Sequence, residues 1–219
     1  MRSTDGSGEL ERLLDEQVAY YRANAPEYGE HTLPFAGADE LTAALDAFGP
    51  TGSVLELACG TGLWTGQLLR HATDVTALDA SPEMLAVAAG RHAGDRVRFI
   101  EADIFGWQPD RRYDVVFFGF FLSHVPIERF ESFWSLVAEC LRPGGRVFFV
   151  DDAYRTADEL IEGEASSTIR RRLNDGTAYR IVKVPHRPAE LEERLARAGW
   201  QVSVSGTSGP FYWGAGAPA

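Results

Sequence analysis

Cysteine and lysine are scarce in this sequence of 219 residues, and no apolar run is long. The two cysteines, Cys59 and Cys140, lie far apart and without the spacing of metal ligands, so neither a disulfide framework nor a zinc site is predicted. Every apolar stretch falls short of the roughly 20 residues that a membrane-spanning helix needs. The first residues are polar and acidic, unlike a secretion signal. We therefore expect a cytoplasmic protein with no membrane segment and no bound metal.

The formal net charge is -11, with 32 acidic and 21 basic side chains. Nucleic-acid binding depends on clustered Lys and Arg, so nucleic acid is not an expected partner. The charge is nevertheless uneven, because residues 170–187 contain one acid, Asp175, and six basic residues: Arg170, Arg171, Arg172, Arg180, Lys183 and Arg187. Lys183 is the single lysine of the chain. A basic segment in an acidic chain requires a functional or structural explanation.

Short apolar runs alternate with helical patterns through the middle of the chain. The runs cover residues 54–57, 75–78, 97–100, 115–118 and 147–150. Continuous apolar strands separated by helices indicate a parallel sheet that is covered on both faces. Two amphipathic helices are predicted before these strands, over 9–25 and 38–48. After residue 151 we predict a polar helix, a strand over 177–184, a helix opened by Pro188 and two final strands near 201–204 and 211–213.

Residues 54–62, VLELACGTG, form a predicted buried strand that leads into a glycine-rich turn and a helix. Gly60 and Gly62 let the backbone pass close under a ligand and leave helix N–H groups facing it. A dinucleotide-binding turn would carry Gly or Ala where Thr65 stands. Glu56 would repel a pyrophosphate and suits a cationic cofactor. The pattern therefore disfavours NAD.

This acid–x3–Gly–x–Gly pattern resembles the first motif of the class I S-adenosylmethionine (SAM)-dependent methyltransferases. The resemblance continues through Asp79 and Met84 after the second strand, Asp103 after the third, Asp114 in the fourth and LRPGG at 141–145. It covers residues 53–151 in the right order and spacing. It implies an α/β, Rossmann-like fold with a mainly parallel seven-stranded sheet, an antiparallel last strand and helices on both faces.

The resemblance also implies one domain over 1–219 with four parts. Residues 1–50 would form an N-terminal helical lid and 51–153 the cofactor-binding core. Residues 154–187 would form an inserted helix-strand cap with the basic substrate-binding segment, and 188–219 the last helix and strands. SAM would be the cofactor and S-adenosylhomocysteine (SAH) the product.

Family roles can be carried over to individual residues. Asp79 would bind both ribose hydroxyls, Asp103 the adenine amino group, and Tyr28 would lie near the sulfonium, while Arg22 would be a partner for the methionyl carboxylate. The alternative for the lid tyrosines is that they only pack a helix onto the sheet. The full set of expected cofactor-binding residues is Tyr21, Arg22, Glu56, Ala58, Gly60, Gly62, Asp79, Ala80, Met84, Asp103, Ile104 and Gly119.

The methyl acceptor is expected beyond the fourth strand, where His124 follows. Imidazole titrates near neutral pH, so His124 is a candidate general base, or else an orienting or structural histidine. His124 and Tyr28 are the predicted catalytic residues.

Residues 169–184 resemble small O-methyltransferases of antibiotic biosynthesis, including phosphonate O-methyltransferases. This resemblance runs nearly the full length of the chain and is weaker in the lid. It implies that Arg170 or Arg171, together with Lys183 and Tyr20, binds a small anionic acceptor such as a phosphonate, phosphate or carboxylate. The alternative is a solvated hairpin that balances an acidic surface.

Two other functions stay open at this point. One is His124-assisted O- or N-methylation of a neutral phenol, hydroxyl or amine, and the other is a non-catalytic nucleotide-binding module. The identity of the acceptor is not encoded in a readable pattern, and a homo-oligomer is left open.

Overall fold

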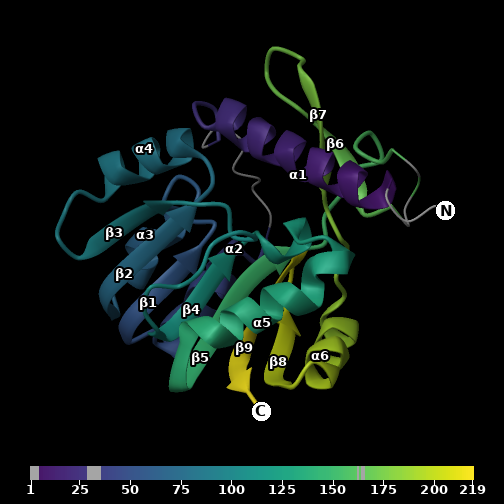
Figure 1. Ribbon diagram of the computed structural model, residues 1–219. Coiled ribbons are helices and arrows are strands. Elements are labelled where there is room, and N and C mark those ends of the chain that lie inside the picture. Colours follow the sequence, from purple (N-terminus) through teal and green to yellow (C-terminus); the bar gives the residue numbers. More distant parts are fainter. Residues whose placement is uncertain (1–4, 29–35, 162, 164–165) are drawn as a thin grey trace.

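The computed structural model describes residues 5–28, 36–161, 163 and 166–219. Its main feature is a seven-stranded sheet with the order β3-β2-β1-β4-β5-β9-β8 (Figure 1). The strands are β1 (Gly52–Leu57), β2 (Ala72–Asp79), β3 (Val97–Glu101), β4 (Tyr113–Gly119), β5 (Leu141–Asp152), β8 (Trp200–Gly206) and β9 (Phe211–Pro218). Only β9 runs antiparallel to its neighbours in this sheet. The predicted fold class, with its antiparallel last strand, is confirmed.

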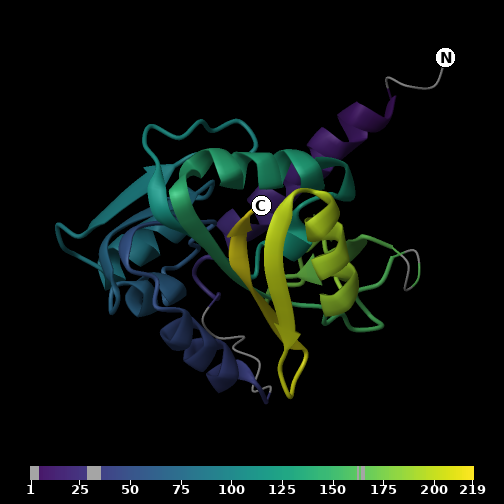
Figure 2. The same cartoon turned by 90° about the horizontal axis from the view of Figure 1, so that it is seen from below.

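Helices cover both faces of the sheet, as the continuous apolar strands predicted. The helices are α1 (Asp5–Asn24), α2 (Ala38–Phe48), α3 (Leu63–Leu68), α4 (Pro82–Arg91), α5 (Phe130–Cys140) and α6 (Pro188–Arg197), with short 3-10 turns η1 (Leu122–His124) and η2 (Ile127–Arg129). Seen from below, α5 and α2 lie on opposite sides of the sheet (Figure 2). Buried leucines of α2 and α3 pack on one face, and aromatic side chains of α5 and leucines of α6 pack on the other. No helix in the described ranges is long and apolar enough to cross a membrane.

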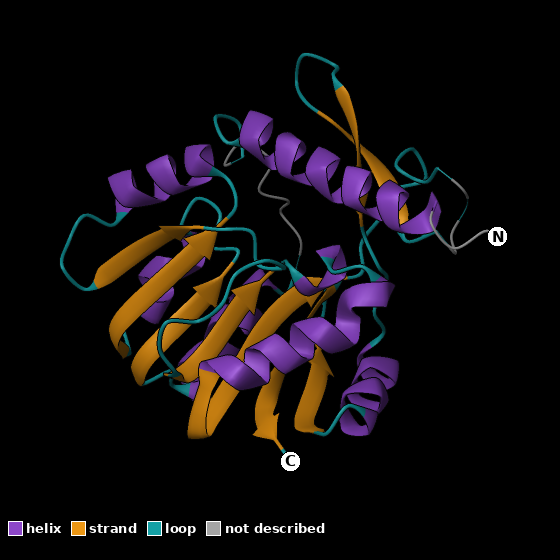
Figure 3. Ribbon diagram, in the orientation of Figure 1, coloured by secondary structure: helices purple, strands orange, loops and turns teal. Residues whose placement is uncertain are grey.

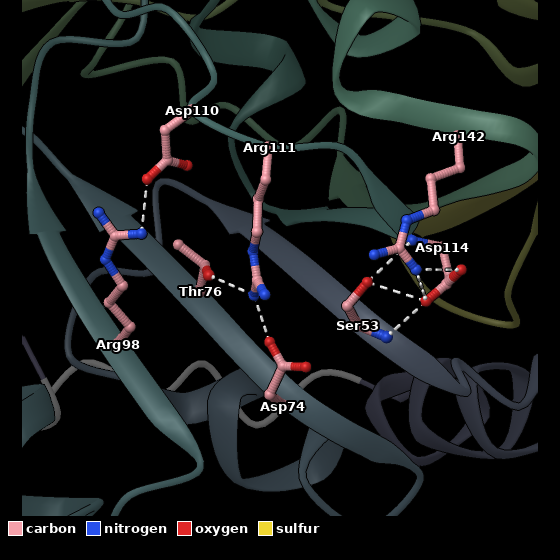
Figure 4. Close-up of polar contacts among 8 residues, drawn as sticks. All are labelled: Ser53, Asp74, Thr76, Arg98, Asp110, Arg111, Asp114 and Arg142. Carbon is pink, nitrogen blue, oxygen red and sulfur yellow. Dashed lines mark hydrogen bonds and ion pairs between the residues drawn. The ribbon is translucent and has the colours of Figure 1, made fainter.

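Polar contacts fix the amino ends of the strands (Figure 4). Asp114 at the start of β4 accepts hydrogen bonds from the backbone N–H of Ser53, at the start of β1, and from Arg142, at the start of β5. Arg111 binds Asp74 and Thr76 of β2. These contacts hold the strands in register at their amino ends. The carboxyl ends of the parallel strands, on the opposite side, are left for ligands.

Helix α1 lies across the carboxyl ends of the strands, beside a hairpin that is separate from the main sheet (Figure 3). The hairpin consists of β6 (Thr168–Arg172) and β7 (Ala178–Val182). Tyr20 of α1 packs on Ile169 and Ile181, and Leu14 packs on Val182. The apolar side chains of the hairpin therefore hold α1 in place.

The cap differs from the expected helix-strand unit. Among residues 153–161, 163 and 166–187, the structure has turns and the hairpin but no α-helix. The segment after residue 151 is rich in polar residues that suit a helix surface, yet it lacks a run of apolar residues at helical spacing that could be buried against the sheet. The strand pairing of Ile169 with Ile181 buries its few apolar side chains instead.

Candidate active site

A cavity of about 520 Å³ lies at the carboxyl ends of the strands, between them and α1. This is where ligands bind in open α/β sheets. Among the predicted site residues, those that line it are Tyr21, Arg22, Tyr28, Ala58, Gly60, Asp79, Ala80, Met84, Asp103, Ile104, Gly119 and His124. The sequence motifs from separate strands thus converge on one cavity.

The two glycines of the turn after β1, Gly60 and Gly62, are required for different reasons. Gly60 has φ +53 and open space where a side chain would stand, so the backbone is bare toward the cavity. Gly62 has φ +76, and a Cβ there would meet His92 and Ala88 of the α4 region at 3.0 and 3.1 Å. Gly62 does not line the cavity, so its predicted ligand contact is replaced by close packing of the turn against α4.

Asp79 ends β2 and accepts hydrogen bonds from two backbone N–H groups, those of Gly60 at 2.8 Å and Ser81 at 2.9 Å. Burial raises the pKa of this carboxyl, and the two backbone donors oppose that shift. Ser81 also caps α4 by accepting the N–H of Met84 at 3.1 Å. One carboxylate therefore links the glycine turn to the start of the next helix at the wall of the cavity.

Glu56 is not at the cavity, contrary to the prediction. Its side chain is 1% exposed and accepts the Thr65 hydroxyl at 2.6 Å, which ties α3 to β1. Burial raises the pKa of Glu56 to about 8. The acid lies in the interior of the core beneath the turn, because Glu56 is still within β1 and its side chain points to the sheet face that α3 covers.

Tyr21 and His124 form the other end of the cavity. The Tyr21 hydroxyl lies 2.9 Å from Nε2 of His124, and His124 Nδ1 lies 2.5 Å from the carbonyl oxygen of Val182. A carbonyl can only accept, so Nδ1 carries the proton of the ring. Burial, aided by the charge of Lys183, holds the pKa of His124 well below its usual value. The ring is therefore neutral, and Nε2 accepts the Tyr21 hydroxyl.

Tyr28 lies between the two ends of the cavity. Its ring centroid is 6.4 Å from that of Tyr21, and burial together with the charge of Asp79 raises its pKa to about 12. Tyr20, in contrast, is 7% exposed and packs against Tyr179 and the hairpin isoleucines. It does not line the cavity. The packing alternative holds for Tyr20, and the predicted substrate contact does not.

The paired arginines of β6 point in opposite directions, because side chains alternate along a strand. Arg170 is exposed. Arg171 shares the inward face with Ile169, and its Nε lies 2.9 Å from Glu159 Oε1 without a hydrogen bond of good geometry. Its charge lowers the pKa of Tyr21 and Tyr28, a smaller effect than the burial that raises both. Arg171 thus lies near the Tyr21–His124 end without lining the cavity, and Arg170 points away from it.

Lys183 is buried in an ion-pair cluster rather than open to the cavity. Its Nζ lies 3.0 Å from Asp152 Oδ2 and 3.6 Å from Asp151 Oδ1, and it donates to Ser123 Oγ at 3.0 Å. Its side chain is 2% exposed. A buried ammonium needs paired carboxylates, and two stand at the end of β5. The expected substrate contact of Lys183 is therefore replaced by a structural one.

Sequence reasoning missed the partner of one predicted residue, Arg22, and two further residues that line the cavity. Arg22 lines the cavity but its guanidinium binds Glu83 of α4 at 2.9–3.2 Å, so a protein carboxylate already holds the group expected for the methionyl end. Phe120 lines the cavity with φ +55, a strained conformation that often marks functional sites. Gln17 lies one helical turn before Tyr21 on the same face of α1 and also lines the cavity. Only this i, i+4 spacing could have indicated Gln17.

Comparisons with known proteins agree with this geometry. A methyltransferase domain model matches residues 54–145. The ubiquinone biosynthesis O-methyltransferase of Xanthomonas axonopodis pv. citri (strain 306) is 30% identical over 206 residues, which is 90% of this chain and 82% of that protein.

Two solved structures are similar over nearly the whole chain. The DhpI-SAM-HEP complex is 44% identical with a TM-score of 0.85 and covers 94% of this chain and 98% of that one. The DhpI-SAH complex is 44% identical with a TM-score of 0.82, covering 94% and 97%. These findings favour the enzyme over a non-catalytic nucleotide-binding module. The chain belongs to the class I SAM-dependent methyltransferases, with SAM as its methyl donor and SAH as its product.

Proposed function

We propose that this enzyme methylates an oxygen atom of a small anionic acceptor, a phosphonate, phosphate or carboxylate, as a step in antibiotic biosynthesis in the cytoplasm. The observation that carries the proposal is the inward position of Arg171 behind the Tyr21–His124 end of the cavity. The O-methyltransferase relatives and the 44% identity to DhpI, which forms a complex with SAM and HEP, support it.

The cavity suits SAM at the end formed by the glycine turn. Gly60 offers bare backbone, Asp79 a carboxylate at the end of β2, and Asp103 a second one after β3. Bound SAM supplies a methyl group made electrophilic by its sulfonium. These residues would hold the cofactor, and Tyr28 would lie beside its sulfonium, where the cofactor and the acceptor meet.

Methyl transfer is an in-line displacement, so the task of the protein is to align the attacking oxygen. That oxygen loses negative charge in the transition state, and a cation bound to it would stabilise the ground state more. A cation must therefore hold another oxygen of the acceptor. A phosphonate or phosphate has spare oxygens for the planar guanidinium of Arg171.

His124 orients in this proposal and does not act as the general base. Both of its ring nitrogens have partners, and its pKa lies well below the usual value because it is buried. An acceptor that is ionised at pH 7 needs no base. The bond between Tyr21 and His124 also favours a second function, in which a neutral hydroxyl passes its proton to Tyr21 as Tyr21 passes its own to His124.

Arg171→Gln and Arg170→Gln form a matched pair on opposite faces of one strand. With a panel of phosphonates, phosphates, carboxylates, phenols and amines, we expect Arg171→Gln to raise KM for the anionic acceptor roughly ten- to a hundredfold, the effect of losing one charge-assisted hydrogen bond. SAM affinity should not change, and Arg170→Gln should behave as wild type. The second function would be established instead if the enzyme methylated only phenols or amines, and if this activity were lost in His124→Asn and intact in Arg171→Gln.

A further inference from the structure

Gln17 has a role in this site that none of the sequence motifs describes. Its side chain is 6% exposed, although glutamine is usually found at the surface. Its Oε1 accepts the backbone N–H of Val182 at 3.0 Å, and its Nε2 donates to the backbone carbonyl of His124 at 3.4 Å. One buried amide thus joins the lid helix α1 to the hairpin strand β7 and to the turn η1.

These contacts close a ring of hydrogen bonds around His124. Gln17 binds Val182, the Val182 carbonyl accepts Nδ1–H of His124, and the His124 carbonyl accepts Gln17. Tyr21, four residues after Gln17 on the same helix face, donates its hydroxyl to Nε2. The backbone N–H of His124 donates to the carbonyl of Phe121. Every other polar group of His124 therefore has its partner on α1 or β7.

We propose that Gln17 is a positioning residue that makes the tautomer and orientation of His124 depend on the docked lid helix. Gln17 fixes the Val182 backbone whose carbonyl selects the Nδ1–H tautomer, and this leaves Nε2 free to accept Tyr21. The orientation of the Tyr21 hydroxyl in the acceptor end of the cavity then follows. The effect of this arrangement of Tyr21 and His124 on turnover rests on the proposed function. The tautomer of His124 does not depend on that function.

Glu16 supplies the matched control, because it docks the same helix on the same strand without touching His124. It accepts the backbone N–H of Arg180 at 2.6 Å and the Nε of Arg180 at 2.9 Å. Glu16→Met and Gln17→Met each remove two hydrogen bonds of α1 and introduce the same side chain. Both lost bonds of Glu16 are to β7, whereas Gln17 loses one to β7 and one to η1. Only Gln17→Met removes a contact to His124.

The test is the nitrogen-15 NMR spectrum of the imidazoles, recorded with SAH bound and with His124 assigned from a His124→Asn variant. We expect wild type and Glu16→Met to show the neutral Nδ1–H tautomer, and Gln17→Met to show a mixture of tautomers. SAH affinity should stay within about twofold in both variants. With an identified acceptor, kcat should fall about tenfold in Gln17→Met alone, the size of one lost hydrogen bond.

An unchanged His124 tautomer in Gln17→Met would overturn the proposal, and so would equal changes in both variants, since Gln17 would then only dock the helix. Should Gln17→Met fail to fold by circular dichroism, Gln17→Leu decides, because it also removes both the acceptor for Val182 and the donor to His124. A wild-type tautomer in that variant is contrary to the proposal. Failure to find an anionic acceptor would refute the proposed function and leave the spectra unaffected.

Discussion

Asp79 illustrates how one side chain is prepared for a ligand before the ligand arrives. Its two oxygens already accept the N–H groups of Gly60 and Ser81, so the carboxylate is held at the cavity wall. This arrangement costs little reorganisation when a ribose binds, because the acceptor is already oriented. Its position after the second strand predicts only that it lies at the carboxyl end of the sheet, and its ribose role is implied by the resemblance to the family motif.

We therefore expect Asp79→Ala to weaken SAM binding by about 1.5–3 kcal/mol, the loss of charged hydrogen bonds in a buried site. Isothermal titration calorimetry measures this directly. Asp110→Ala, which removes an exposed carboxylate paired with Arg98, is the control and should leave the affinity unchanged. Equal affinity of Asp79→Ala and wild type would show that the ribose binds elsewhere.

At the scale of elements, the hairpin marks the limit of sequence reasoning. Motifs that follow the core strands could be placed because strand order and burial fix which end of the sheet they share. Arg170 and Arg171 could not be separated, since their faces depend on the register of a two-stranded pair that packs on α1. Lys183 could not be placed either, because its carboxylate partners lie about thirty residues earlier in the chain.

The buried cluster of Lys183, Asp151 and Asp152 joins the end of β5 to the segment after β7. Removing one partner of a buried ion pair leaves uncompensated charge, so Lys183→Met should lower the free energy of unfolding by about 3–5 kcal/mol. Urea denaturation measures the loss. Lys183→Met combined with Asp151→Asn should recover part of it. Wild-type stability together with a raised acceptor KM would instead restore Lys183 as a substrate contact.

For the whole molecule, the predicted functional residues gather where three parts of the fold meet. The sheet supplies Gly60 and Asp79, α1 supplies Gln17 and Tyr21, and the hairpin stands behind His124. The core could be predicted because its pattern is local and repeated. The end formed by Tyr21 and His124 could not, because it exists only when α1 and the hairpin are docked together.

Buried ionisable groups give this molecule opposing pH dependences. Burial lowers the pKa of His186 to about 4, so its contribution to stability is lost as the pH falls from 6.5 toward 4. Burial raises the pKa of Glu56 from 4.5 to about 8. The folded state therefore binds more protons than the unfolded state in that window, and the Glu56 contribution declines as the pH rises from 4.5 to 8.

Glu56→Gln isolates the second effect, because an amide oxygen can still accept the Thr65 hydroxyl and carries no proton to lose. The free energy of unfolding of this variant, relative to wild type, should be flat below about pH 4.5. It should then rise up to about pH 8, by an amount on the order of a few kcal/mol. Urea denaturation between pH 4 and pH 9 measures the difference, with the exposed Glu128→Gln as control. A difference that stays constant across this range would mean that Glu56 is ionised in the folded protein and that the core beneath the glycine turn holds a charge.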